Sequence, residues 1–224
     1  MGLDMYLHRM PRYRGATADD VDAVESYLDW LRAKADGSDY ANCSFEKWCG
    51  RAKAPSKENL EFYADYYKAH YSDWDTEHKH PWMRITEEVG YWRKANQIHN
   101  WFVKNIQDGV DDCNYHREVT EEDLNELLDI CKRVLASCEM VDGKVRNGYT
   151  YEDERMVPII EEGQYVKDSS VAEELLPSTS GFFFGSTDYD KWYVQDIENT
   201  INIITKVLET TDFDTQMVYY VSSW

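Results

Sequence analysis

The sequence has few basic residues for its length. Its 224 residues include 24 Lys and Arg against 43 Asp and Glu, so the formal net charge is −19 at pH 7. A chain with this charge repels phosphate backbones, and we do not expect it to bind nucleic acid nonspecifically. The acidity has two interpretations. It can keep the protein soluble, or it can imitate nucleic acid and occupy the nucleic-acid-binding surface of a host protein.

Long apolar runs and secretory features are also missing. No apolar stretch reaches the ~18 residues that a membrane span requires, and the start Met-Gly-Leu-Asp-Met has neither the basic nor the apolar part of a signal peptide. The five cysteines include no Cys-x-x-Cys pair. An odd number of cysteines without a secretory signal favours reduced thiols, so we expect a cytoplasmic protein that does not contact a membrane.

The sequence lacks the short motifs of the common nucleotide-dependent and hydrolytic folds. It has no Gly-x-x-x-x-Gly-Lys-Ser/Thr, no Gly-x-Gly-x-x-Gly and no Gly-x-Ser-x-Gly. P-loop hydrolysis, dinucleotide binding and α/β-hydrolase chemistry therefore have no support. His70, His78 and His80 lie in one irregular stretch with several acidic residues, but their spacing matches no established zinc site. The stretch is either a divalent-metal site or a solvated loop. We predict neither a metal nor a cofactor.

What the sequence does contain is the periodicity of an α+β protein. Residues 2–8 alternate between apolar and polar, and residues 216–221 are rich in strand-forming types, so both ends predict strands. Three phenylalanines bracketed by glycines, Phe182 to Phe184, predict another strand. Helical periodicity follows Thr17 and Thr120, each three residues before an aspartate that completes a capping box. We predict one α+β domain, in which amphipathic helices surround a small sheet made of these three strands.

One acidic, glycine-punctuated stretch departs from this pattern. Residues 142–166 contain three glycines and a proline, which indicates turns within an irregular or hairpin segment. We interpret this stretch as an excursion from the predicted domain.

The most informative stretch runs from Glu88 to Val103. Interpreted as a single helix, it has one apolar face that holds Val89, Trp92, Asn96, His99 and Val103. Asn96 and His99 are polar, and a buried polar group without a hydrogen bond costs about 1–3 kcal/mol. They belong either to an internal network satisfied by the protein's own groups or to the polar floor of a ligand pocket.

The pocket interpretation predicts which residues bind. Aromatic faces stack on bases, and Arg or Lys meets phosphate. A strand–glycine–helix junction after residue 184 presents backbone N–H groups to an anion. Two alternatives leave no ligand there: Ser186 or Thr187 can cap the helix in the ordinary way, and Asp188 and Asp190 in its first turn can themselves occupy its positive end. The predicted ligand-binding residues are Tyr91, Trp92, Arg93, Lys94, Asn96, His99, Gly185, Ser186 and Thr187.

Three function hypotheses follow. The first is a non-catalytic protein that binds a small anionic, nucleotide-like ligand. The second is an acidic inhibitor or nucleic-acid mimic that acts on a host protein. The third is a hydrolase in which His99 is the general base and Asp188 or Asp196 orients it. Nothing in the sequence shows that these side chains meet, so no catalytic residue is assigned. The sequence indicates no oligomeric state.

Three segments resemble a family of small uncharacterised proteins of bacteriophages and prophages. They are Gly2 to Leu7 (Gly-Leu-Asp-Met-Tyr-Leu), Gly90 to His99 (Gly-Tyr-Trp-Arg-Lys-Ala-Asn-Gln-Ile-His), and Leu175 to Pro177 together with Gly181 to Thr187. The resemblance touches both ends and the middle of the chain but not residues 142–166. It implies a phage accessory protein that acts in the cytoplasm of a bacterial host and, by analogy, interferes with host defence. The family has no assigned activity, so the resemblance implies no catalytic residue.

Overall fold

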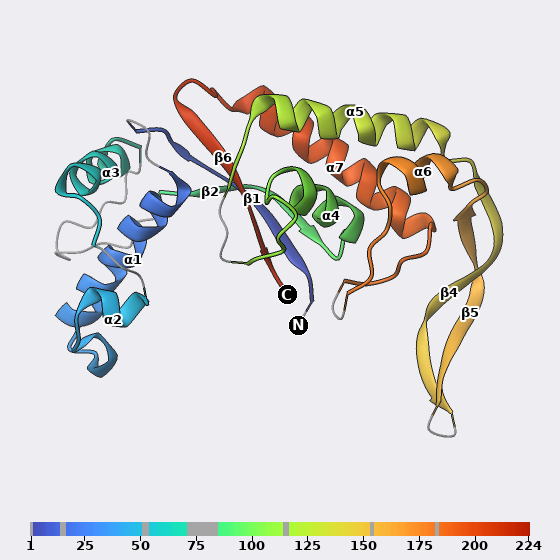
Figure 1. Cartoon of the computed structure of the whole chain (residues 1–224), viewed down its shortest axis with the longest axis horizontal. Coiled ribbons are helices and arrows are strands. Elements are labelled where there is room, and N and C mark those ends of the chain that lie inside the picture. Colours follow the sequence, from blue (N-terminus) through green and yellow to red (C-terminus); the bar gives the residue numbers. More distant parts are fainter. Residues whose placement is uncertain are drawn as a thin grey trace. The chain divides into compact units, whose positions relative to one another are not determined.

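The computed structural model describes residues 2–13, 17–50, 54–70, 85–113, 117–152, 155–181 and 184–224. The fold is α+β, and the two ends of the chain contribute adjacent strands to one sheet (Figure 1). This sheet has the order β2-β1-β6-β3, with β1 at Asp4–Pro11, β2 at Glu87–Arg93, β3 at Arg117–Val119 and β6 at Gln216–Ser223. The predicted fold class and the pairing of the N- and C-terminal strands are confirmed.

The predicted phenylalanine strand has a different outcome. Phe182 and Phe183 lie outside the described residues, and Phe184 adopts a bend with a buried side chain. The ring of Phe184 packs edge-on against His99, with 5.0 Å between the ring centroids. In the described sheet, β2 and β3 are the partners of the two terminal strands.

The chain divides into two compact units. The second unit, formed by Arg9–Glu87 and Asp214–Tyr219, contains α1 (Ala18–Ala35), the 3₁₀ turn η1 (Asp39–Ala41), α2 (Phe45–Cys49) and α3 (Lys57–His70). Thr17 caps α1 in the capping box that the sequence predicts, and Trp30, Ala41 and Phe45 form a small core. The single domain expected from the sequence stays a prediction.

The first unit is formed by Met1–His8, Glu88–Phe213 and Tyr220–Trp224. It contains α4 (Asn96–Asn105), α5 (Glu121–Ser137), α6 (Ser170–Leu175) and α7 (Lys191–Thr210), with α5 and α7 packed side by side (Figure 1). Thr120 caps α5 as predicted, in a complete capping box with Asp123. The excursion at residues 142–166 is a long antiparallel hairpin of β4 (Met140–Glu152) and β5 (Arg155–Val166).

The predicted central helix is wrong over residues 88–93, which form most of β2. Gly90 explains the strand, because a Cβ atom there would lie 2.6 Å from Cγ2 of Ile203, so the glycine lets α7 pack directly against β2. Valine, tyrosine and tryptophan also favour strands. Lys94 then takes a left-handed conformation (φ 61°), and Ala95 (φ −73°, ψ 71°) has the geometry of an inverse γ-turn. Helix α4 therefore begins only at Asn96.

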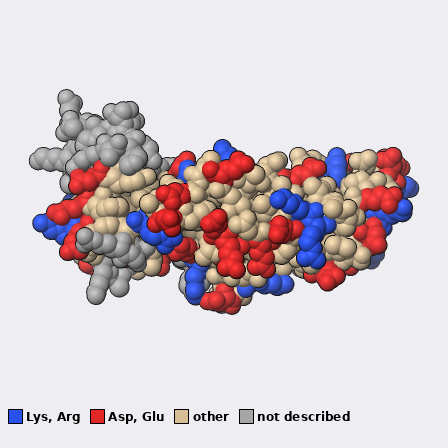
Figure 2. Space-filling model, turned by 90° about the horizontal axis from the view of Figure 1, so that it is seen from above, with Lys and Arg blue, Asp and Glu red and all other residues tan. Residues whose placement is uncertain are grey.

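The described helices include none that is both long enough and apolar enough to cross a membrane. On the face drawn in Figure 2, acidic side chains are spread widely and basic side chains lie among them. This face therefore does not present one uninterrupted acidic surface.

Candidate functional site

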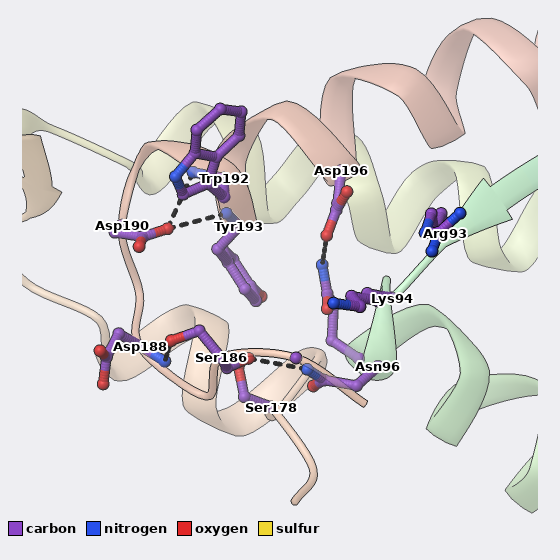
Figure 3. Close-up of a pocket in the computed structure, with 12 residues that line it drawn as sticks. Arg93, Lys94, Asn96, Ser178, Ser186, Asp188, Asp190, Trp192, Tyr193 and Asp196 are labelled. Carbon is purple, nitrogen blue, oxygen red and sulfur yellow. Dashed lines mark hydrogen bonds between the residues drawn. The ribbon is translucent and has the colours of Figure 1, made fainter. Parts of the chain in front are cut away.

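A pocket of about 380 Å³ opens in the first unit where β2 ends and α4 begins (Figure 3). Arg93 and Lys94 contribute its basic side chains, and the first two residues of α4 form part of its floor. The opposite wall comes from the N-terminal turns of α7, and Ser178 together with residues 185–188 completes the lining. The pocket thus joins parts of the chain that are about 80 to 100 residues apart in sequence.

Asn96 holds the backbone at Thr179, Phe184 and Ser186 in place. Its amide nitrogen donates to the carbonyl oxygens of Ser186 (2.8 Å) and Phe184 (3.2 Å), and its amide oxygen accepts from the N–H of Thr179 (2.8 Å). Only 2% of Asn96 is exposed. Three backbone groups of one segment therefore use the hydrogen-bonding capacity of this side chain, so Asn96 lines the pocket as a positioning residue.

Lys94 and Gly185 form the corner of the pocket. Gly185 has a φ of 90°, and a Cβ atom there would lie 3.2 Å from Cβ of Lys94 and 3.5 Å from its Cδ. Only glycine combines this conformation with such a close approach. The backbone of Lys94 is held by its own N–H, which donates to the carbonyl of Leu3 (2.8 Å), and by its carbonyl, which accepts from Asn96 N–H (2.8 Å). The aliphatic part of the lysine therefore lies along Gly185.

The positive charges at this corner have no ion-pair partner among the residues that the structure describes. Within the described ranges, neither Arg93 nor Lys94 forms an ion pair. Asp188, on the rim, instead pairs with Arg146 of the hairpin at 2.8 Å. The pocket therefore contains two cationic side chains whose charge is available to a ligand.

Asp190 caps α7. Its Oδ1 accepts from the N–H groups of Trp192 (2.8 Å) and Tyr193 (3.2 Å), and the side chain is buried. The expected cap at Ser186 or Thr187 is therefore wrong. The hydroxyl of Ser186 accepts from the N–H of Asp188 (3.1 Å), which closes a local turn ahead of the helix, while Asn96 holds the Ser186 carbonyl.

Asp196 lies nearly two turns further along α7 and is the acid of the pocket whose pKa is shifted. Burial raises its pKa to about 6, and the charge of Asp190 adds to this effect. The one hydrogen bond that lowers the pKa comes from Nε2 of Gln97, 3.3 Å from Oδ2. A carboxylate that is kept in a position where its charge is disfavoured, inside a pocket, is a typical feature of functional sites.

The structure places five of the nine predicted ligand-binding residues around this pocket: Arg93, Lys94, Asn96, Gly185 and Ser186. Tyr91, Trp92, His99 and Thr187 do not line it.

Tyr91 and Trp92 lie apart because they belong to a strand, in which successive side chains point to opposite faces. The hydroxyl of Tyr91 donates to Asp4 (2.6 Å) on an exposed face. The indole N–H of Trp92 donates to Thr200 of α7 (2.9 Å) and is buried. The predicted helix placed both rings on one wall, and the strand separates them.

His99 is buried in a satisfied network, with 1% of the residue exposed. Its Nδ1 lies 2.7 Å from the hydroxyl of Tyr220, and its Nε2 lies 3.1 Å from Oδ2 of Asp111. Because an ionised carboxylate only accepts hydrogen bonds, Nε2 carries the hydrogen. Trp224 donates to the other oxygen of Asp111 (3.1 Å). Asp111 is therefore the carboxylate partner of His99, and the expectation that Asp188 or Asp196 fills this role is wrong.

Gln97 is not among the site residues predicted from the sequence, and Asp196 enters that prediction only as a partner of His99. The single-helix interpretation placed Gln97 on the solvent side, whereas the residue is 2% exposed and bonds to Asp196. A signal for Asp196 was present, because it stands three residues after Tyr193 and directly before Ile197, both on the buried face of α7. An acidic residue beside an apolar stripe calls for a partner or a ligand.

The histidine stretch stays untested, because His78, His80 and the side chain of His70 lie outside the described residues. The described part of the chain holds no cluster of three His, Cys, Asp or Glu residues suited to a metal ion. No protein-family model, curated protein or solved structure matches this chain. The chemistry of the site is therefore argued from its own geometry.

Proposed function

We propose that the pocket at the end of β2 binds a small anionic, nucleotide-like ligand and does not convert it. The observation that carries this proposal is the corner formed by Arg93 and Lys94, whose charges have no ion-pair partner among the described residues. Basic side chains at a concave site attract phosphate and carboxylate groups. The backbone of Gly185 lies against Lys94 and lets a ligand approach the main chain.

Further support comes from the rest of the lining. Tyr193 and Trp192 provide aromatic surface on the α7 side, with 57% of Trp192 exposed. The volume of about 380 Å³ lies within the range of small-molecule sites. His99, the proposed general base of a hydrolase, is sealed in its own network away from this lining, which favours binding over catalysis.

The resemblance of three segments to phage proteins supports a biological setting for this binding. In that setting the protein is a phage accessory protein that captures a nucleotide-derived signal in the cytoplasm of a bacterial host. Capture without turnover would keep such a signal from the host proteins that respond to it.

Isothermal titration calorimetry tests the proposal with ADP-ribose, cyclic mononucleotides, AMP and inorganic phosphate as probes. We expect at least one phosphate-bearing probe to bind, and Lys94→Met to weaken its binding about tenfold, as loss of a charged hydrogen bond does. The matched control is Lys104→Met, at the exposed far end of α4. Absence of binding by every probe, or an equal loss in both variants, would contradict the proposal.

A second candidate function, binding to a host protein, is favoured by the hairpin. Tyr151 and Met156 form a cross-strand pair and are 74% and 57% exposed, and Ile160 on the same strand face is 52% exposed. Exposed apolar surface of this kind marks protein interaction sites. A stoichiometric host partner that is captured by the native chain and lost in the double variant Tyr151→Ser/Met156→Ser would support this function. Equal capture by both proteins would argue against it.

A further inference from the structure

We infer that the ligand of this pocket carries a nitrogen hydrogen-bond donor as well as its anionic group, with the donor placed against Asp196 and the anion against Lys94 and Arg93. This inference rests on the proposed function and names the class of ligand. The class is an amino-bearing phosphate, such as a nucleotide whose base has an exocyclic amino group.

Opposite charges line one pocket without neutralising each other. Asp196 comes from α7 and Lys94 from the turn after β2, and Figure 3 shows them on different walls. No ion pair joins them in the described part of the chain. The influences on the Asp196 carboxyl are burial, Gln97 and Asp190, and none of them is a cation.

The other carboxylates of the pocket already have strong hydrogen-bond or ion-pair partners. Asp188 pairs with Arg146 at 2.8 Å, and Asp190 accepts two backbone N–H groups at the start of α7. An ionised carboxylate has about four lone-pair positions, and the described structure fills one position on Asp196, with the Gln97 amide. Asp196 differs from both, because its partner in the described structure is a single neutral amide that leaves the carboxylate charge unbalanced and most of its acceptor positions open to a ligand.

A ligand of this pocket has to satisfy both Asp196 on one wall and Lys94 on the other. A buried carboxylate that lacks donors is costly, so binding is favoured when the ligand brings N–H groups to it. Inorganic phosphate offers the anion for Lys94 but only repulsion for Asp196. An amino-bearing phosphate offers both, and an oxo analogue of the same shape presents an acceptor where the amino group would be.

The experiment compares matched probes by calorimetry at pH 7.5: AMP against IMP, CMP against UMP, and phosphoethanolamine against ethyl phosphate. We expect the amino member of a bound pair to bind about tenfold more tightly, the effect of one hydrogen bond to a charged group. Asp196→Asn should bring this ratio towards one, because the amide can both donate and accept. It keeps an acceptor for Gln97, which preserves the local fold.

Two controls separate this effect from general electrostatics and from misfolding. Glu198→Gln removes one negative charge from an exposed position two residues further along α7 and should leave the ratio unchanged. Far-ultraviolet circular dichroism should show that all variants retain their helices.

The outcomes also separate this inference from the proposed function. Binding of phosphate probes with an amino-to-oxo ratio near one in the native chain would overturn the inference and leave the function standing. A tenfold ratio that persists in Asp196→Asn would also overturn it. Absence of binding by every probe would overturn both. A ratio that falls in Asp196→Asn but not in Glu198→Gln would support both.

Discussion

Two polar clusters in the first unit, both built on α4, differ in how completely their groups are satisfied. Around His99, the ring nitrogens face Tyr220 and Asp111, and Trp224 adds a bond to the same carboxylate. Around Asp196, no ion pair within the described residues balances the carboxylate or the nearby Arg93 and Lys94. Asn96 and His99 are only three positions apart in the sequence, yet the first lies at a pocket and the second is sealed. Burial of a polar side chain is therefore a weak indication of function, whereas unbalanced charge in a cavity is a stronger one.

The largest loss of stability is expected on substitution of Asn96, at the floor of the pocket. Asn96→Ala leaves the N–H of Thr179 and the carbonyls of Phe184 and Ser186 without their partner, so the free energy of unfolding should fall by about 3 kcal/mol. Urea denaturation followed by tryptophan fluorescence measures the change. Asn199→Ala, on the exposed side of α7, is the control and should change stability by less than about 0.5 kcal/mol. A loss below about 1 kcal/mol at Asn96 would show that the backbone at Thr179, Phe184 and Ser186 does not depend on it.

Asp196→Asn should raise the free energy of unfolding, whereas Asn96→Ala lowers it. The pKa of Asp196 is raised from 3.8 to about 6 in the folded chain. Between these values the native state binds more protons at Asp196 than the unfolded state does, so the contribution of this group to stability is fully present below pH 4 and is lost as the pH rises through 6. The substitution should stabilise the protein by up to about 3 kcal/mol at pH 8 and have little effect at pH 4.

Denaturation of the native chain and of Asp196→Asn at both pH values checks this sign. Glu198→Gln should show no comparable difference between the two pH values. Destabilisation by Asp196→Asn at pH 8 would mean that the charge is already compensated, and the contrast between the two clusters would fail.

His99→Gln tests the other cluster, in which the hydrogen bonds are satisfied. Glutamine can meet only one of the two partners of the imidazole, so one of Tyr220 and Asp111 loses its hydrogen bond at a cost of about 2 kcal/mol. Ligand affinity should not change, because His99 does not line the pocket. Thermal unfolding and calorimetry together measure both quantities. Lost affinity at unchanged stability would make His99 a site residue after all.

The smallest effect is expected at Tyr91→Phe. This change removes the bond to Asp4 on an exposed face, and surface substitutions of this kind change stability by less than about 0.5 kcal/mol. Probe affinity should also be unchanged. A clear loss of affinity, measured by the same calorimetry, would return Tyr91 to the ligand-binding residues.

The parts of the fold that could be predicted depend on neighbours in the sequence. The alternation in β1 and the capping box at Thr120 involve residues two or three positions apart, and both predictions are confirmed. The helix predicted over residues 88–93 failed because Val89 and Trp92 fit a helical spacing as well as they fit a strand. The decisive factor there is Gly90 meeting Ile203, which no local pattern reveals.

Some residues of the candidate site could likewise be identified from the local sequence, and others depend on distant contacts. Lys94, Asn96 and Gly185 could be identified because they stand in unusual local contexts: a basic pair beside aromatic residues, a polar residue in an apolar stripe and a glycine after a phenylalanine run. The role of Asp196 depends on Gln97, 99 positions earlier in the chain, and on the burial that their contact produces. Such long-range properties become visible only in the folded structure.

The hydrogen bonds of Asn96 span 83, 88 and 90 residues, and this has a consequence for how the pocket forms. Contacts between distant parts of a chain close late, since loop-closure entropy opposes them until much of the structure is in place. The binding surface would then be among the last features to assemble. A ligand that recognises only the finished surface would draw the folding equilibrium towards the native state, and its presence during synthesis would raise the yield of active protein.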